Sequence, residues 1–110
     1  MRNFLFPIVL LTTACALPAP GTEPIDAKAT NGRLLVRTHC GDCHAIGRRD
    51  VSKHPDAPPL RVLSQNYPVT ALEESLAEGI VVGHPDMPEF RFRSDDIAAI
   101  ISYLESIQQF

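Results

Sequence analysis

The chain has 110 residues, with 13 Asp and Glu against 10 Lys and Arg, and a formal net charge of −3. A chain of this length forms one small domain, and a core of protein side chains alone is marginal at that size. Trp is absent and aromatic residues make up only 6% of the sequence, which weakens such a core further. The negative net charge argues against a nucleic-acid-binding protein, because those proteins present a basic face.

Residues 1–16 have the features of a secretory signal peptide. Arg2 provides the positive end, residues 4–11 are largely apolar, and residues 14–16 fit the small-residue cleavage rule. The apolar run is too short to span a membrane. Cys15 has a second interpretation, as the lipid-bearing cysteine of a lipoprotein, although the residues before it match that motif poorly. We therefore expect a periplasmic protein that is bound to a membrane only if Cys15 is lipidated.

Three prolines within residues 17–24 predict a linker, and residues 25–110 are expected to form one domain. A helix is predicted to begin at Asp26, whose carboxylate can cap the first turn. His39, near the end of this helix, is expected at the surface. The apolar stripe of the helix has spacings of three and four and leads directly into the next motif. Its members are Ile25, Ala29, Gly32, Val36 and Cys40.

The stretch Cys40-Gly41-Asp42-Cys43-His44 is the pattern for covalent attachment of c-type haem. Each thiol adds to one haem vinyl group, and the histidine that follows binds the iron as its proximal ligand. Two alternatives use the same residues. A redox-active dithiol is typically near a βαβ pattern, and none is visible in this sequence. A zinc site would combine Cys40, Cys43 and His44 with His54, but no second CxxC motif completes it.

With this motif, the chain resembles the small class I (monohaem) bacterial c-type cytochromes, and the resemblance covers residues 25–110. The resemblance implies an all-α cytochrome c fold, with about three main helices wrapped around one covalently bound haem c. Haem of this type is attached outside the cytoplasm in bacteria, which agrees with the predicted leader. In the family a glycine at the position of Gly32 lets the terminal helices cross closely.

Residues 50–61 are predicted to form a loop, because Pro55, Pro58 and Pro59 forbid regular structure there. In the family, the carbonyl of a proline soon after the haem motif accepts the Nδ1 proton of the proximal histidine, which fixes its tautomer. Pro58 is the candidate for this role, with Leu60 packing on the haem face. The alternative is a rigid loop without a specific contact.

A second helix is predicted over residues 70–80. Thr70 and Glu73 form a capping box at its start, and its apolar stripe falls at spacings of four. The stripe consists of Leu72, Leu76 and Ile80. We expect this helix to wall the haem pocket.

Met87 is the only methionine besides the initiator, and it lies in a loop rich in proline and glycine, residues 83–90. A lone methionine usually fills a core, but a polar, proline-flanked loop is where filler is least expected. Members of the family carry the distal axial ligand as a methionine in such a loop. Met87 is therefore the predicted sixth ligand of the iron, with His84 as the competing ligand and an open site as the third alternative.

The last helix is predicted over residues 94–108, with Ser94 as its cap and two acids in its first turn. Tyr103 and Leu104 match a pair that the family places at the crossing of the terminal helices. The apolar stripe is continuous. It consists of Ile97, Ile100, Ile101, Leu104 and Ile107.

Basic residues gather near the haem motif and again near the Met87 loop. They are expected to form a solvated surface or, for one or two of them, to pair with haem propionates or steer a redox partner. These residues are Arg48, Arg49, Lys53, Arg61, Arg91 and Arg93.

Together these features predict a monomeric electron carrier rather than an enzyme. His44 and Met87 would saturate the iron, so that single electrons pass between redox proteins such as a periplasmic dehydrogenase, oxidase or reductase. The alternative is a haem-based gas sensor or a redox-enzyme subunit whose Met87 is displaceable. A zinc-bound structural module is the third class.

Overall fold

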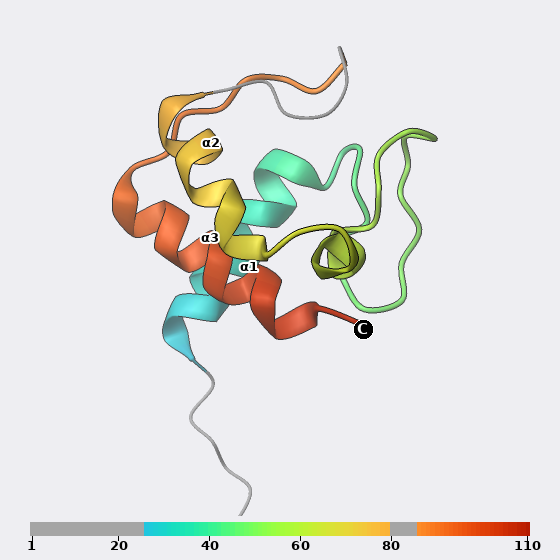
Figure 1. The fold of residues 1–110 in the computed structure, drawn as a ribbon, viewed down its shortest axis with the longest axis horizontal. Helices are drawn as coiled ribbons and strands as arrows, with labels where there is room; N and C mark the ends of the chain where they lie inside the picture. The colour runs from blue at the N-terminus through green and yellow to red at the C-terminus, as the bar shows by residue number, and fades with distance from the viewer. Residues whose placement is uncertain (1–25, 80–85) are drawn as a thin grey trace, which may run out of the picture.

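The computed structural model describes residues 26–79 and 86–110. Within these ranges the fold is all-α, with three α-helices and no strand (Figure 1). The predicted signal peptide and linker lie outside the described residues, as do Cys15, Ile25, Ile80 and His84. The helices are α1 (Ala27–Cys40), α2 (Leu72–Glu78) and α3 (Ser94–Ile107), and two 3-10 helices precede α2, η1 (Leu60–Gln65) and η2 (Val69–Ala71).

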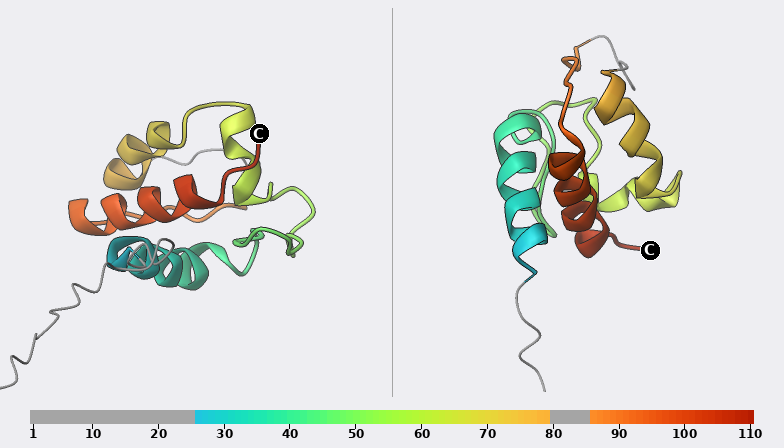
Figure 2. Two further views of the ribbon diagram at one scale, coloured as in Figure 1. Left: turned by 90° about the horizontal axis from the view of Figure 1, so that it is seen from below. Right: turned by 90° about the vertical axis from the view of Figure 1, so that its left-hand side faces the viewer.

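Helix α3 is the centre of the fold. Figure 2 shows it between α1 on one side and α2 with η1 on the other. No helix in the described ranges has the length and apolar character needed to cross a membrane. The predicted order of the three main helices is confirmed, and α3 is the element that both others contact.

The crossing of α1 and α3 depends on Gly32. A Cβ atom built on this residue would overlap the carbonyl group of Ala99 and lie 2.9 Å from the Cβ of Tyr103. Any side chain would therefore push the two helices apart. The close approach that the family resemblance implies at Gly32 is confirmed.

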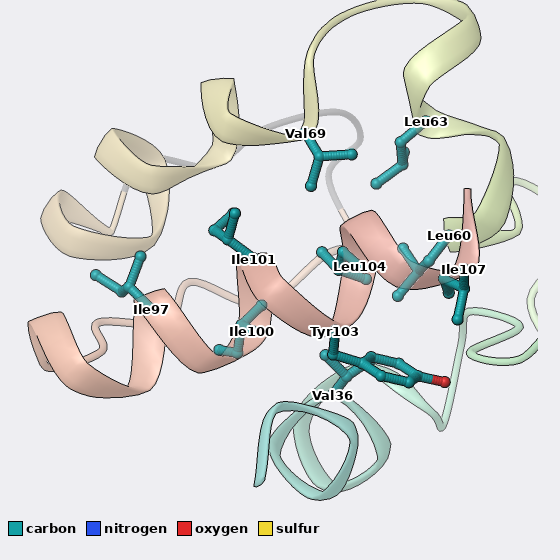
Figure 3. Close-up of a cluster of buried hydrophobic side chains, with 10 residues drawn as sticks. All are labelled: Val36, Leu60, Leu63, Val69, Ile97, Ile100, Ile101, Tyr103, Leu104 and Ile107. Carbon is teal, nitrogen blue, oxygen red and sulfur yellow. The ribbon is translucent and has the colours of Figure 1, made fainter. Parts of the chain in front are cut away.

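One hydrophobic cluster joins the helices (Figure 3). Val36 of α1 is fully buried against α3, which supplies most of the cluster. The apolar stripe predicted for α3 is buried throughout, and Tyr103 lies beside it. The other members come from the two 3-10 helices, namely Leu60, Leu63 and Val69.

Helix α1 begins as predicted. The Oδ1 atom of Asp26 accepts a hydrogen bond from the backbone N–H of Lys28 at 3.0 Å. The Oδ2 atom of the same carboxylate accepts a bond from the Ser102 hydroxyl at 3.1 Å. Asp26 therefore caps α1 and also ties its start to α3.

Two predicted caps are wrong. Thr70 lies inside η2, so it does not directly precede α2. Helix α2 begins after Ala71, which makes no side-chain cap. The N–H of Leu72 bonds instead to the carbonyl of Val69 in the preceding turn. The capping box of Thr70 and Glu73 is therefore absent. Ser94 is the first helical residue of α3, and the residue before it, Arg93, is extended and makes no side-chain cap.

The ends of the predicted loop and of the second helix also differ from expectation. Leu60 and Arg61 belong to η1 rather than to the loop over residues 50–61. Helix α2 ends at Glu78, because Gly79 adopts a left-handed conformation with φ of +77° and donates its N–H to the Ser75 carbonyl at 2.9 Å. Glycine is the residue that takes this conformation without steric cost.

Candidate functional site

The site is built at the point where α1 ends. The backbone N–H groups of Cys43 and His44 both bond to the carbonyl of Cys40, at 3.2 and 2.9 Å. This tight turn brings the two cysteines and the histidine together. Both cysteines are half-buried.

A cavity of about 440 Å³ opens beside this turn. The three motif residues Cys40, Cys43 and His44 line it together with Met87. Met87 is half-buried and belongs to the segment that precedes α3. The structure therefore places all four predicted haem-binding side chains on one cavity, whereas the competing ligand His84 lies outside the described residues.

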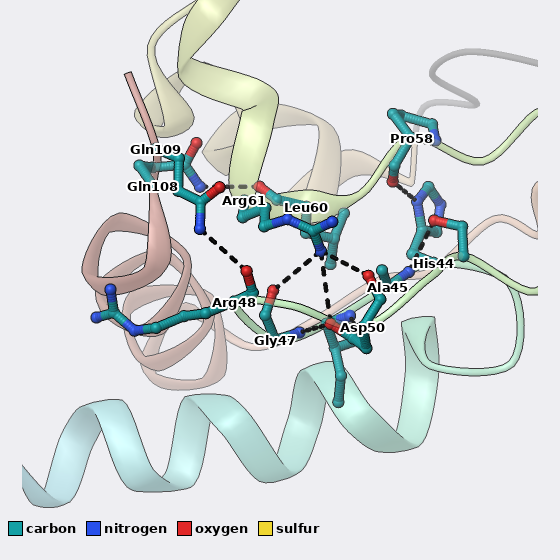
Figure 4. Close-up of polar contacts among 12 residues, drawn as sticks. His44, Ala45, Gly47, Arg48, Asp50, Pro58, Leu60, Arg61, Gln108 and Gln109 are labelled. Carbon is teal, nitrogen blue, oxygen red and sulfur yellow. Dashed lines mark hydrogen bonds and ion pairs between the residues drawn. The ribbon is translucent and has the colours of Figure 1, made fainter.

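A hydrogen bond fixes the tautomer of His44. Its Nδ1 atom lies 2.8 Å from the carbonyl oxygen of Pro58 (Figure 4). A carbonyl oxygen can only accept, so the proton is on Nδ1 and the lone pair is on Nε2, which is the atom free to bind a metal. This is the hydrogen bond that the family resemblance implies for Pro58.

Backbone contacts hold this proline segment against the haem motif. Leu60 donates its N–H to the carbonyl of Ala45 at 2.9 Å, and His54 donates its N–H to the carbonyl of Cys43 at 3.1 Å. The Ser52 hydroxyl accepts from the N–H of Ala45 at 2.9 Å. Leu60, predicted to pack on the haem face, is buried in the hydrophobic cluster.

Behind His44 lies a second support, formed by Asp50 and Arg61 (Figure 4). The Asp50 carboxylate accepts hydrogen bonds from the N–H groups of Ile46 and Gly47 at 2.9 and 2.8 Å. The Arg61 guanidinium lies 3.6 Å from that carboxylate and donates to the Asp50 carbonyl at 2.8 Å. This pair closes the turn that follows the haem motif.

The ionisation of Asp50 reflects these contacts. Partial burial raises the pKa of Asp50, but the backbone N–H groups of Ile46 and Gly47 and the Arg61 guanidinium outweigh that effect. The pKa of Asp50 therefore lies below its ordinary value. The carboxylate form is the one that closes the turn.

Two glutamines after α3 complete the support, and the sequence analysis did not identify them. The Gln108 side chain accepts from the N–H of Ser64 at 2.9 Å and donates to the carbonyl of Leu60 at 2.8 Å. Gln109 donates from its side chain to the carbonyl of Arg48 at 3.0 Å and from its backbone N–H to the carbonyl of Arg61 at 2.8 Å. We call the set Asp50, Arg61, Gln108 and Gln109 the polar network. Polar residues at a helix end give no sequence signal for partners this distant.

The zinc alternative lacks a site. Within residues 26–79 and 86–110, no group of three or more His, Cys, Asp or Glu side chains converges in a way that could hold a metal ion. His54 instead directs its Nε2 atom toward the Asp86 carboxylate at 3.4 Å. Burial raises the pKa of the Cys40 thiol to about 11.

The basic residues near the haem motif divide into two groups. Arg61 is committed to the polar network, Arg48 donates to the carbonyl of Ser106 at 2.6 Å, and Arg91 lies 3.6 Å from the carboxylate of Glu89. Arg49, Lys53 and Arg93 are exposed. Arg61 therefore has a structural role instead of the surface role first considered for it.

Comparison with protein families agrees with this geometry. A family model for cytochrome c matches residues 29–108, which is most of the chain and nearly all of the described part. The chain belongs to the cytochrome c family. No curated protein and no solved structure gives a significant match.

Cytochromes c bind haem c covalently, and this cytochrome c has both cysteines of the attachment motif on one cavity. They are in general electron carriers that work with other redox proteins. The donor set fits the cofactor, because two thiols, an imidazole with its Nε2 lone pair free and a thioether all line the cavity.

Proposed function

We propose that this cytochrome c carries single electrons between redox proteins of the periplasm, with His44 and Met87 as the axial ligands of the haem iron. Cys40 and Cys43 hold the haem through thioether bonds. Haem c supplies a one-electron Fe(III)/Fe(II) couple when bound, and histidine–methionine ligation raises its potential.

The observation that carries the proposal is the hydrogen bond between His44 and Pro58. It orients the imidazole, presents Nε2 as the donor atom and makes that atom a stronger base. Met87 faces the same cavity from a different segment of the chain. With an imidazole and a thioether on the two axial positions, no position remains for oxygen or peroxide, which separates an electron carrier from a gas sensor or an oxidising enzyme.

Fast electron exchange also needs a site that changes little between redox states. The hydrogen bonds that the carbonyls of Cys43, Ala45 and Pro58 accept hold the segment around His44 in one arrangement. A neutral imidazole remains the ligand in both oxidation states, so electron transfer requires no proton movement at His44.

Optical spectra of the purified holoprotein test the ligand set. We expect a low-spin spectrum with the weak sulfur-to-iron band, unchanged by carbon monoxide in the reduced protein. Met87→Ala removes the band and makes the reduced protein bind carbon monoxide. Met87→His is the matched control, since it keeps the spectrum low-spin while removing the sulfur band. A native spectrum that is high-spin, or that carbon monoxide shifts strongly, contradicts His44/Met87 ligation and favours the sensor or enzyme.

The location is a separate part of the proposal and rests on residues 1–16. We expect the leader to be cleaved and the mature protein to be recovered in the soluble periplasmic fraction, with Cys15→Ser behaving identically. Recovery of the native protein with membranes, and of Cys15→Ser in the soluble fraction, would instead identify a lipoprotein.

A further inference from the structure

Three aromatic rings meet beside the cavity. The His39 ring lies 5.5 Å from the Phe90 ring and 5.1 Å from the Phe92 ring, centroid to centroid, with interplanar angles of 70° and 84°. The two phenylalanine rings are 5.8 Å apart. The two pairs that include His39 are edge-to-face, a geometry that aromatic rings favour, whereas the two phenylalanine rings are tilted by 35° to each other. We call the three residues the aromatic cluster.

The aromatic cluster joins two segments that carry haem-binding residues. His39 directly precedes Cys40 at the end of α1, and Phe90 is the third residue after Met87. Both His39 and Phe90 line the same cavity as Met87. Three residues of extended chain span at most about 10 Å, so the position of Phe90 limits where Met87 can lie.

The cluster is anchored on the protein side by Phe92. Its backbone N–H donates to the carbonyl of Leu76 in α2 at 2.9 Å, and its ring packs against the hydrophobic cluster. His39, at the end of α1, contacts both phenylalanine rings. Phe90 and Phe92 therefore link the segment that follows Met87 to α1 and, through Phe92, to the hydrophobic cluster.

The polar contacts of this segment within the described residues are weaker. The Asp86 carboxylate that faces His54 is 72% exposed, and the Arg91–Glu89 pair is on the surface. Exposed ion pairs contribute little to stability, because water screens them. Ring packing against His39 is thus stronger than these ion pairs of residues 86–92.

We infer that His39 is a positioning residue for Met87: its ring closes the Met87 segment against the haem-attachment motif and keeps the thioether on the iron. This inference rests on the proposed His44/Met87 ligation. His39 is an exposed residue of α1, so its removal leaves the buried core intact. Its loss raises the fraction of molecules in which Met87 has left the iron.

Imidazole binding to the oxidised holoprotein measures that fraction. An external ligand binds only where Met87 is displaced, so its apparent dissociation constant falls in proportion as the open fraction rises. We expect His39→Ala to bind imidazole about 3- to 10-fold more tightly than the native protein, as loss of two edge-to-face contacts implies. Phe90→Ala changes the affinity in the same direction.

Two variants distinguish ring packing from other causes. His39→Phe keeps an aromatic ring without the ring nitrogens, and we expect its imidazole affinity to be that of the native protein. Leu34→Ala removes a 51% exposed side chain from the same helix, away from the cavity lining, and is also expected to leave the affinity unchanged.

The outcomes separate cleanly. Unchanged imidazole affinity in His39→Ala overturns the inference. If His39→Phe binds imidazole as tightly as His39→Ala does, the effect belongs to the ring nitrogens and the inference is also overturned. Equal tightening in Leu34→Ala would show a general loosening of α1 and would overturn it too. Absence of the sulfur-to-iron band in the native protein contradicts the proposed function itself, which is a different result.

Discussion

The two sides of the haem cavity are supported in different ways. The side of His44 is held by backbone hydrogen bonds and by the polar network, which reaches from the haem motif to the end of α3. Among the described residues, the side of Met87 is held by a backbone bond to α2, by the aromatic cluster and by exposed ion pairs. Directional bonds fix His44, whereas Met87 depends on side-chain packing. Under the proposed ligation, His44 is therefore the more firmly held ligand and Met87 the more easily displaced one.

We expect the largest effect from a substitution at the crossing of α1 and α3, which supports both sides of the cavity. Gly32→Ala places a methyl group on the carbonyl of Ala99 and forces α1 away from α3. We expect a loss of about 3 kcal/mol or more in the free energy of unfolding, because overpacking against backbone cannot be relieved by a rotamer change. Chemical denaturation of the holoprotein measures it. Asn31→Ala, at the neighbouring exposed position of α1, is the control, and an equal loss there would contradict the helix-crossing explanation.

A pair of arginine substitutions compares the two sides directly. Arg61→Ala removes a side chain that is 17% exposed and donates into the polar network, whereas Arg91→Ala removes one that is 74% exposed and pairs on the surface. We expect about 2 kcal/mol of destabilisation for Arg61→Ala and less than about 0.5 kcal/mol for Arg91→Ala. Denaturation midpoints at the same pH provide the measurement. Equal losses would remove the distinction between the two sides.

The pH dependence of stability tests the contribution of Asp50 to the His44 side. The folded state lowers the pKa of Asp50, so its contribution to stability is present above the ordinary value of 3.8 and is lost as the pH falls through the lower folded value. We expect Asp50→Asn to be less stable than the native protein at pH 7, with the difference shrinking as the pH falls below 3.8. Denaturation at pH 7, 5 and 3 measures this. A difference that persists undiminished at pH 3 would contradict the ionic role of Asp50.

We expect the smallest changes in the free energy of unfolding from substitutions at the starts of α1 and α2. Asp26→Ala removes the cap of α1 and is expected to cost about 1 kcal/mol. Thr70→Ala, before α2 on the Met87 side, is expected to change the free energy of unfolding by less than about 0.5 kcal/mol, because Thr70 caps nothing in the structure. Thermal or chemical denaturation distinguishes the two. A loss near 1 kcal/mol for Thr70→Ala would restore the capping box that the sequence suggested.

Local sequence signals predicted what depends on local geometry. The spacing of apolar residues identified α1 and α3, and Asp26 was correctly expected to cap α1, whereas the crossing at Gly32 was predicted from the family resemblance. The caps at Thr70 and Ser94 failed because a short 3-10 turn, or a shift of one residue, changes which side chain precedes the helix. Neither change alters the spacing of apolar residues, so the hydrophobic pattern does not predict it.

The contacts that hold His44 were only partly predictable. Pro58 could be named from the family resemblance, whereas Asp50, Arg61 and Gln108 could not, because each of their partners depends on how distant segments meet. The aromatic cluster was missed for the same reason, and His39 was predicted only as a surface residue. Its exposure is correct, but exposure gave no indication of its two ring neighbours.

The long reach of Gln108 and Gln109 bears on the order in which the protein matures. Their side chains contact Leu60 and Arg48 across 48 and 61 residues of sequence. Contacts of such separation form late, since loop closure must precede them. The local turn at Cys40–His44 needs no such closure, so we expect it to form before the side chains of Gln108 and Gln109 dock against Leu60 and Arg48.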